Sequence, residues 1–127
     1  MNSQSKIIVK LNNLIWVWNA NELRGKGVVS HEEYFPGLDV VDVLTTDVYT
    51  ENYDNRNYDI LLKLGQGKPI AIGECGPSPT EEMLRDQPNW VWFMIWARFP
   101  WGNKNVPDKI RELYNHPHVL TIEEVGF

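Results

Sequence analysis

The chain has 127 residues, of which 43% are hydrophobic, and this fits one globular unit with enough apolar side chains for a real core. Its formal net charge of -5, without any run of lysine or arginine, argues against nucleic acid and against an anionic membrane surface as partner. The one cysteine excludes an internal disulfide, and no apolar stretch is long enough to span a bilayer.

The first part of the chain predicts two strands separated by a long loop. Asn13 to Trp18, NLIWVW, is apolar on both faces, which is typical of a strand covered on both sides. Asn19 to Gly37 is polar and contains several glycines, so it predicts a long loop, and such loops are often functional. Val40 to Val48, VVDVLTTDV, is rich in β-branched residues and predicts a second strand that ends near Asp47 and Tyr49.

A helix, a third strand and a short helix are expected next. Tyr53 to Leu64 has isoleucine and leucine at helical spacing, and Gly65 stands where a C-terminal cap is expected. Pro69 to Gly73 predicts the third strand. Beyond it, Ser78 is expected to cap the short helix at its N-terminus, with Glu81 completing a capping box.

The last part of the chain predicts one more strand and one more helix. Asn89 to Trp96, NWVWFMIW, is again apolar throughout, and Val106 to Asn115 has apolar residues at helical spacing. This alternation of strands and helices predicts an α/β fold with right-handed crossovers and a parallel sheet. Because ligands bind such sheets at the carboxyl ends of the strands, functional residues are expected there.

Aromatic or charged residues stand at the predicted ends of all four strands: Trp18, Asp47 with Tyr49, Glu74, and Trp96 with Arg98. Any one of them alone has an ordinary explanation, such as a solvated acid in a turn, a cap or strand-end packing. Their recurrence at four consecutive strand ends favours a ligand site.

Two further features have a chemical and an ordinary explanation. Cys75 follows Glu74, but no histidine belongs to a motif that would pair with it, which favours a buried, inert thiol. The HPH sequence at His116 to His118 has a generic spacing and no evident third ligand, so a helix stop is favoured over a metal pair. We therefore predict no metal and no cofactor.

Five segments, in order, resemble the carboxyl-terminal half of glycoside hydrolase family 26, the β-mannanases: LNNLIWVWN, VVDVLTTDVY, KPIAIGECGP, PNWVWFMIWARF and LYNHPHVLTIEEV. The resemblance runs from about Leu11 to Phe127, as one unit, whereas residues 1–10 do not look like the family. It implies strands five to eight of a (β/α)8 barrel, that is, a half-barrel. It also implies cleavage of β-1,4-linked mannose backbones with retention of configuration.

The resemblance implies a role for each strand-end residue. Glu74 matches the family's catalytic nucleophile, Tyr49 the tyrosine that hydrogen-bonds it, and Asp47 an acid that lines the same subsite. Trp96 matches the eighth-strand tryptophan under the sugar at the cleavage point. Further substrate contacts are expected from three residues: Trp16, Trp18 and Arg98.

The resemblance also implies what this sequence lacks. The family's acid/base glutamate ends the fourth strand, and the chain begins after that point, so we expect no acid/base here. A half-barrel has two open edges, which predicts self-association or a complementing half-barrel chain. The alternative is a non-catalytic fragment that binds carbohydrate or self-assembles. Family members are typically secreted, but the sequence starts without a signal peptide, and localisation stays open.

Overall fold

The computed structural model describes residues 13–24, 29–51, 53–96 and 105–126. The elements are β1 (Val17–Asn21), α1 (His31–Tyr34), β2 (Val43–Val48), α2 (Asn55–Gly65), β3 (Ile70–Cys75), α3 (Glu81–Asp86), β4 (Trp90–Ile95), α4 (Pro107–Tyr114) and α5 (Ile122–Val125). The order from β2 to α4 is the predicted one, whereas α1 lies in the segment predicted as a loop and α5 was not predicted. The prediction of an α/β fold is confirmed.

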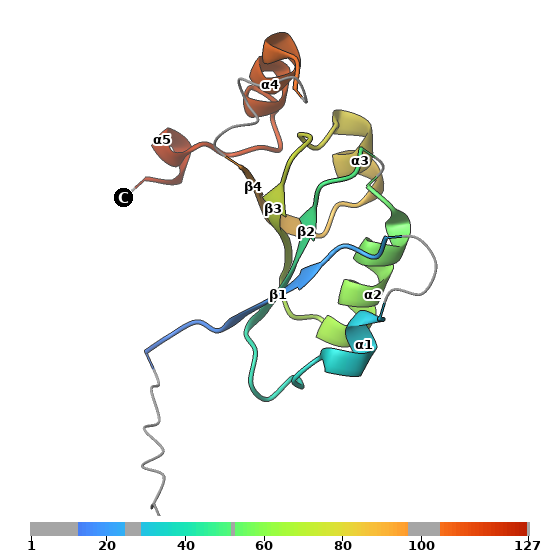
Figure 1. Cartoon of the computed structure of the whole chain (residues 1–127). Coiled ribbons are helices and arrows are strands. Elements are labelled where there is room, and N and C mark those ends of the chain that lie inside the picture. Colours follow the sequence, from blue (N-terminus) through green and yellow to red (C-terminus); the bar gives the residue numbers. More distant parts are fainter. Residues whose placement is uncertain (1–12, 25–28, 52, 97–104, 127) are drawn as a thin grey trace, which may run out of the picture.

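The four strands form one parallel sheet in the order β1-β2-β3-β4. The connecting helices α1, α2 and α3 all lie on the same side of this sheet (Figure 1). Because the strands are parallel, their carboxyl ends share one edge, which is where the candidate site was expected.

The core lies between the sheet and these helices. Leu44 and Ile70 pack against Leu61 of α2, while Ile72 packs with Met83 of α3. Alternate residues of β2 and β3 therefore face the helices, as the period of two in a strand requires. Burial of these side chains is the main stabilising contribution to the fold.

The opposite face of the sheet is open. Val17 precedes the helix-facing Trp18 on β1, and Met94 precedes the core residue Ile95 on β4, so both point to this face. Val17 is 48% exposed and Met94 41%. The expectation that the first strand is covered on both sides is wrong for the described residues. Among them, no helix is long and apolar enough to cross a bilayer.

The first strand begins four residues later than predicted and runs to Asn21. The Trp16 backbone N–H donates to the Asp42 carboxylate, and the Trp16 carbonyl accepts from the N–H groups of Asp42 and Val43. These contacts join the segment to the start of β2, and the regular ladder follows from Val17. Residues 19–21, predicted as loop, are therefore strand.

Two predicted helix caps are wrong by one or two residues. Gly65 is the last residue of α2, and Gln66 takes the left-handed conformation, with φ 47°. The N-cap of α3 is Thr80, whose hydroxyl accepts from the Met83 N–H, and not Ser78. The Ser78 N–H donates instead to the Asn105 side chain at 2.6 Å, so it belongs to the loop that follows β3.

Candidate active site

An irregularity between β2 and β3 directs Glu74 toward the open face. Thr46 pairs with Ile72, but the next pair is Asp47 with Glu74, so β3 has one extra residue, Gly73. This extra residue is a β-bulge. Without it, the alternation of side chains along β3 would place Glu74 on the helix-covered side of the sheet. Bulges next to active sites commonly re-aim a side chain in this way. Here the bulge brings two acids directly opposite each other at the carboxyl ends of adjacent strands.

Tyr49 contacts the Glu74 carboxylate directly. Its phenol O–H donates to Glu74 Oε2 at 2.5 Å, and both side chains are half-buried. This hydrogen bond is the main cause that raises the pKa of Tyr49 to about 12, with burial and the charges of Glu74 and Asp47 adding to it. The phenol therefore stays protonated and continues to donate at neutral pH.

Asp47 is held by a short chain of polar side chains on the same face. Its Oδ2 accepts from Asn19 Nδ2 at 2.9 Å, and Asn19 Oδ1 accepts from the Thr45 hydroxyl at 2.6 Å. Burial is the main cause that raises the pKa of Asp47, and the neighbouring charge of Glu74 adds to it. Asp47 Oδ1 is buried and has no hydrogen-bond partner among the described residues.

Gly73 allows these side chains to meet. A Cβ on Gly73 would lie 3.0 Å from Thr45 Oγ1 and 3.1 Å from Asp47 Oδ1, and closer still to Asn19 Oδ1. Any larger residue would displace the polar group. Glycine is therefore required by space at this point of β3.

The predicted tryptophans do not all join this group. The Trp96 backbone N–H donates to the Cys75 carbonyl at 3.0 Å, and the residue follows β4 with 43% exposure. By contrast, the Trp18 ring packs on Phe35, with ring centroids 5.0 Å apart, on the helix-covered face. Trp16 lies before β1, at the amino end of the sheet. Arg98 lies outside the described residues.

The structure therefore brings together Glu74, Tyr49 and Asp47, with Trp96 on the adjacent strand. Trp16 and Trp18 are not part of this group, and their expected sugar contacts stay a prediction. They were predicted as site residues because tryptophans appeared to end the first strand, but β1 ends at Asn21.

Three polar residues near the site were not predicted. Asn19 holds Asp47, and the buried Glu22 holds the backbone that follows β2. Asn105 donates to the Gly76 carbonyl and accepts from the Ser78 N–H, which fixes the loop after β3. Polar residues directly after an apolar run were a signal for the first two, whereas nothing local in the sequence indicates Asn105.

Cys75 and the two histidines lie away from this chemistry. Burial raises the pKa of Cys75 to about 11, and its Sγ lies 3.4 Å from the Met94 carbonyl oxygen. The thiol is therefore protonated at neutral pH and a poor nucleophile. His116 and His118 contact each other edge to face. The described residues contain no group of three or more side chains suited to a metal ion.

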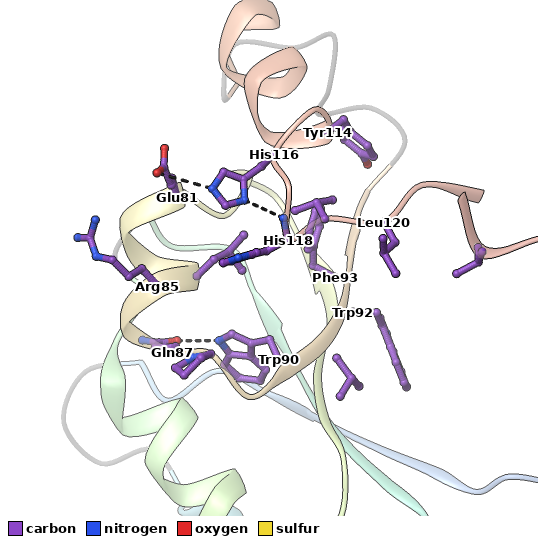
Figure 2. Close-up of a pocket in the computed structure, with 15 residues that line it drawn as sticks. Glu81, Arg85, Gln87, Trp90, Trp92, Phe93, Tyr114, His116, His118 and Leu120 are labelled. Carbon is purple, nitrogen blue, oxygen red and sulfur yellow. Dashed lines mark hydrogen bonds and ion pairs between the residues drawn. The ribbon is translucent and has the colours of Figure 1, made fainter. Parts of the chain in front are cut away.

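A separate hollow of about 770 Å³ lies at the edge of the sheet beside β4. Figure 2 shows its lining, in which His116 faces Glu81 of α3 and Trp90 donates to Gln87. None of the candidate site residues lines it. The hollow is therefore not the candidate active site.

These observations define the class of the protein. It is an α/β protein with a parallel sheet whose carboxyl edge carries two paired acids and a phenol. Its family follows from a direct match: the model of glycosyl hydrolase family 26 covers residues 5–124. The chain belongs to this family.

Relatives and solved structures agree with this assignment. The chain is 33% identical over 121 residues to a mannan endo-1,4-beta-mannosidase of Thermothelomyces thermophilus, covering 91% of this chain and 23% of that protein. It resembles the structure of GH26A from Muricauda sp., with TM-score 0.82 and 43% identity over 91% of this chain and 39% of that one. It also resembles the Podospora anserina GH26-CBM35 beta-(1,4)-mannanase, with TM-score 0.72 and 36% identity over 91% of this chain and 25% of that one. The chain spans between 18% and 24% of the length of its curated relatives.

Proposed function

We propose that this chain carries the nucleophile side of a retaining glycoside hydrolase that acts on β-1,4-mannan. The observation that carries the proposal is the hydrogen bond from the Tyr49 phenol to the Glu74 carboxylate at the carboxyl edge of the sheet. Membership of family 26 and the mannanase relatives support the substrate class.

Glu74 is the attacking group in this mechanism. Its carboxylate oxygen forms an ester bond to the anomeric carbon while the glycosidic C–O bond breaks, and water later hydrolyses the ester. Tyr49 donates to the carboxylate and so fixes its direction and favours its charged form. The phenol does not need to change protonation, because its pKa is about 12.

Asp47 and Trp96 contribute to sugar binding. Asp47 lies opposite Glu74 in the pairing of β2 with β3, which favours contact with the same sugar. The Trp96 indole is 43% exposed and presents a flat apolar surface on which a pyranose C–H face packs. Arg98, two residues further on, remains a proposed contact from its place in the sequence.

The second carboxyl group of the mechanism comes from outside these residues. Retaining hydrolysis requires an acid/base, which protonates the leaving oxygen and then activates water. We propose that this chain forms half of a (β/α)8 barrel and that the other half supplies the acid/base. The exposed apolar side chains on the open face, such as Val17 and Met94, favour such a neighbour.

Release of reducing sugar from β-mannan tests the proposal. The chain is assayed alone and after mixing with the part of the Muricauda relative that it does not match. We expect release in the mixture, and Glu74→Ala abolishes it. Glu82→Ala, which removes an exposed acid on α3, leaves the release unchanged. Release that is unaffected by Glu74→Ala contradicts the assignment of the nucleophile.

The exposure of Trp96 also favours a second candidate, carbohydrate binding without turnover. In that case mannan oligosaccharides quench tryptophan fluorescence, Trp96→Ala removes the quenching, and no mixture releases sugar. Glu74→Ala separates the two candidates, because only hydrolysis depends on the ester that Glu74 forms.

A further inference from the structure

Glu22 is a buried acid that the proposed reaction does not use. It follows β1 directly and is 4% exposed, which is unusual for a glutamate. Its backbone N–H donates to the Asp47 carbonyl at 3.0 Å and so extends the pairing of β1 with β2 by one residue. The side chain is thereby placed beside the two residues that follow β2.

The Glu22 carboxylate accepts from the backbone that carries Tyr49. Oε1 accepts from the N–H of Tyr49 at 2.7 Å and from the N–H of Thr50 at 3.1 Å. Oε2 accepts from the Thr50 hydroxyl at 2.5 Å. Hydrogen bonds to a charged acceptor are stronger than neutral ones, so this carboxylate fixes the backbone where regular pairing ends.

The carboxylate is itself held in place. Arg24 Nη2 lies 2.6 Å from Glu22 Oε1 and Arg24 Nε donates to the same atom at 2.8 Å. The next residue, Leu23, donates its N–H to the Asn57 side chain of α2 at 2.7 Å. The segment after β1 is thus anchored both to a helix and to the end of β2.

We propose that Glu22 is a positioning residue for Tyr49, and this inference rests on the proposed function. By holding the backbone N–H groups of Tyr49 and Thr50, the Glu22 carboxylate sets the direction in which the phenol leaves β2. The phenol then reaches Glu74 Oε2 at 2.5 Å. Glu22 thus acts on Glu74 through Tyr49.

The test follows the Tyr49 phenol by NMR, in protein labelled with ¹³C at tyrosine Cζ. The chain has five tyrosines, and Tyr49→Phe identifies the resonance of interest. A phenol that donates to a carboxylate has a different Cζ chemical shift from one in water. The Glu74→Gln variant therefore gives the chemical shift of Tyr49 Cζ without the hydrogen bond to the carboxylate. The remaining tyrosines report whether each variant is folded.

Glu22→Ala is expected to move the Tyr49 resonance at pH 7 to the Glu74→Gln position, and Glu22→Gln moves it part of the way. Glu112→Gln is the matched control, because it removes an exposed acid whose partner is Lys109 on α4. It leaves the Tyr49 resonance in place. If Glu22→Ala does not fold, Glu22→Gln is the test, and a partial movement of the Tyr49 resonance toward the Glu74→Gln position supports the proposal.

A Tyr49 resonance that stays at the parent position in the folded Glu22 variants overturns the proposal. This readout does not depend on catalysis. If Glu74 is not the nucleophile, sugar release is absent or persists in Glu74→Ala, while the Tyr49 resonance still responds to the Glu22 variants. Failure of the proposed function is therefore distinguishable from failure of this inference.

Discussion

The two faces of the four-stranded sheet differ in burial although both carry apolar side chains. On the helix-covered face, Leu44 and Ile72 have no exposed surface. On the open face, Val17 is 48% exposed and Met94 41%. Parallel sheets are normally covered on both faces. The comparison teaches that the strand sequences specify two buried faces, whereas the helices described here cover one.

The largest expected effect comes from truncation on the covered face. Ile72→Ala should lower the free energy of unfolding by about 2–5 kcal/mol, because it leaves a cavity between sheet and helices. Met94→Ala removes a side chain of similar size from the open face and should cost less than about 0.5 kcal/mol. Urea denaturation of both variants measures the difference, and equal losses would break the comparison.

A smaller but definite loss is expected at a crowded place on the open face, around Gly73. Gly73→Ala forces Asn19, Thr45 or Asp47 to move and should cost about 1–3 kcal/mol in urea denaturation. Gly65→Ala is the matched control. There a Cβ meets Leu44 at an ordinary 3.5 Å, and the change should be neutral or stabilising by about 0.4–1 kcal/mol. If Gly73→Ala does not lower the free energy of unfolding, the side chains of Asn19, Thr45 and Asp47 are not tightly packed.

The sequence predicts the elements of the fold better than their junctions. The order of strands and helices follows from hydrophobic periodicity, and the parallel sheet follows from that order. The start of β1 was missed because it depends on a contact between Trp16 and Asp42, which are far apart in the chain. Thr80 was missed as a cap because Asn105 binds the Ser78 N–H.

For the candidate site, the sequence predicted which residues take part better than how their side chains are oriented. Glu74, Tyr49 and Asp47 were found from their place at strand ends and from the family resemblance. That Glu74 points to the open face depends on the bulge at Gly73, which only the pairing of β2 with β3 reveals. Trp18 shows the opposite case, since an aromatic residue near a strand end packs against the helices.

The stability of the folded protein should depend on pH through Asp47, in the polar group on the open face. Because burial raises the pKa of Asp47 in the folded protein, the folded state holds this proton more tightly than the unfolded state. The free energy of unfolding therefore falls as the pH rises from about 4, the ordinary pKa of aspartate, through the raised pKa of Asp47. Asp47→Asn removes this cost and should be more stable than the parent at pH 7, with the advantage vanishing toward pH 3.

Thermal denaturation at several pH values measures this advantage. Asp59→Asn changes an exposed acid on α2 and should stay close to the parent throughout. An Asp47→Asn variant that is less stable than the parent at pH 7 would mean that the hydrogen bond from Asn19 outweighs the burial of the charge.

The smallest effect on folding is expected from a charge on the edge strand β4, on the open face of the sheet. Met94→Glu leaves the side chain in water and should change the free energy of unfolding by less than about 0.5 kcal/mol. If a second copy covers this face, the same charge would be buried without a partner and would oppose association. Sedimentation velocity at micromolar concentration should then find a dimer or larger species for the parent and a monomer for Met94→Glu. Val29→Glu, at an exposed apolar residue just before α1, should leave the association intact. A strictly monomeric parent would exclude self-association and leave a different chain, or further residues of a longer one, to cover the open face.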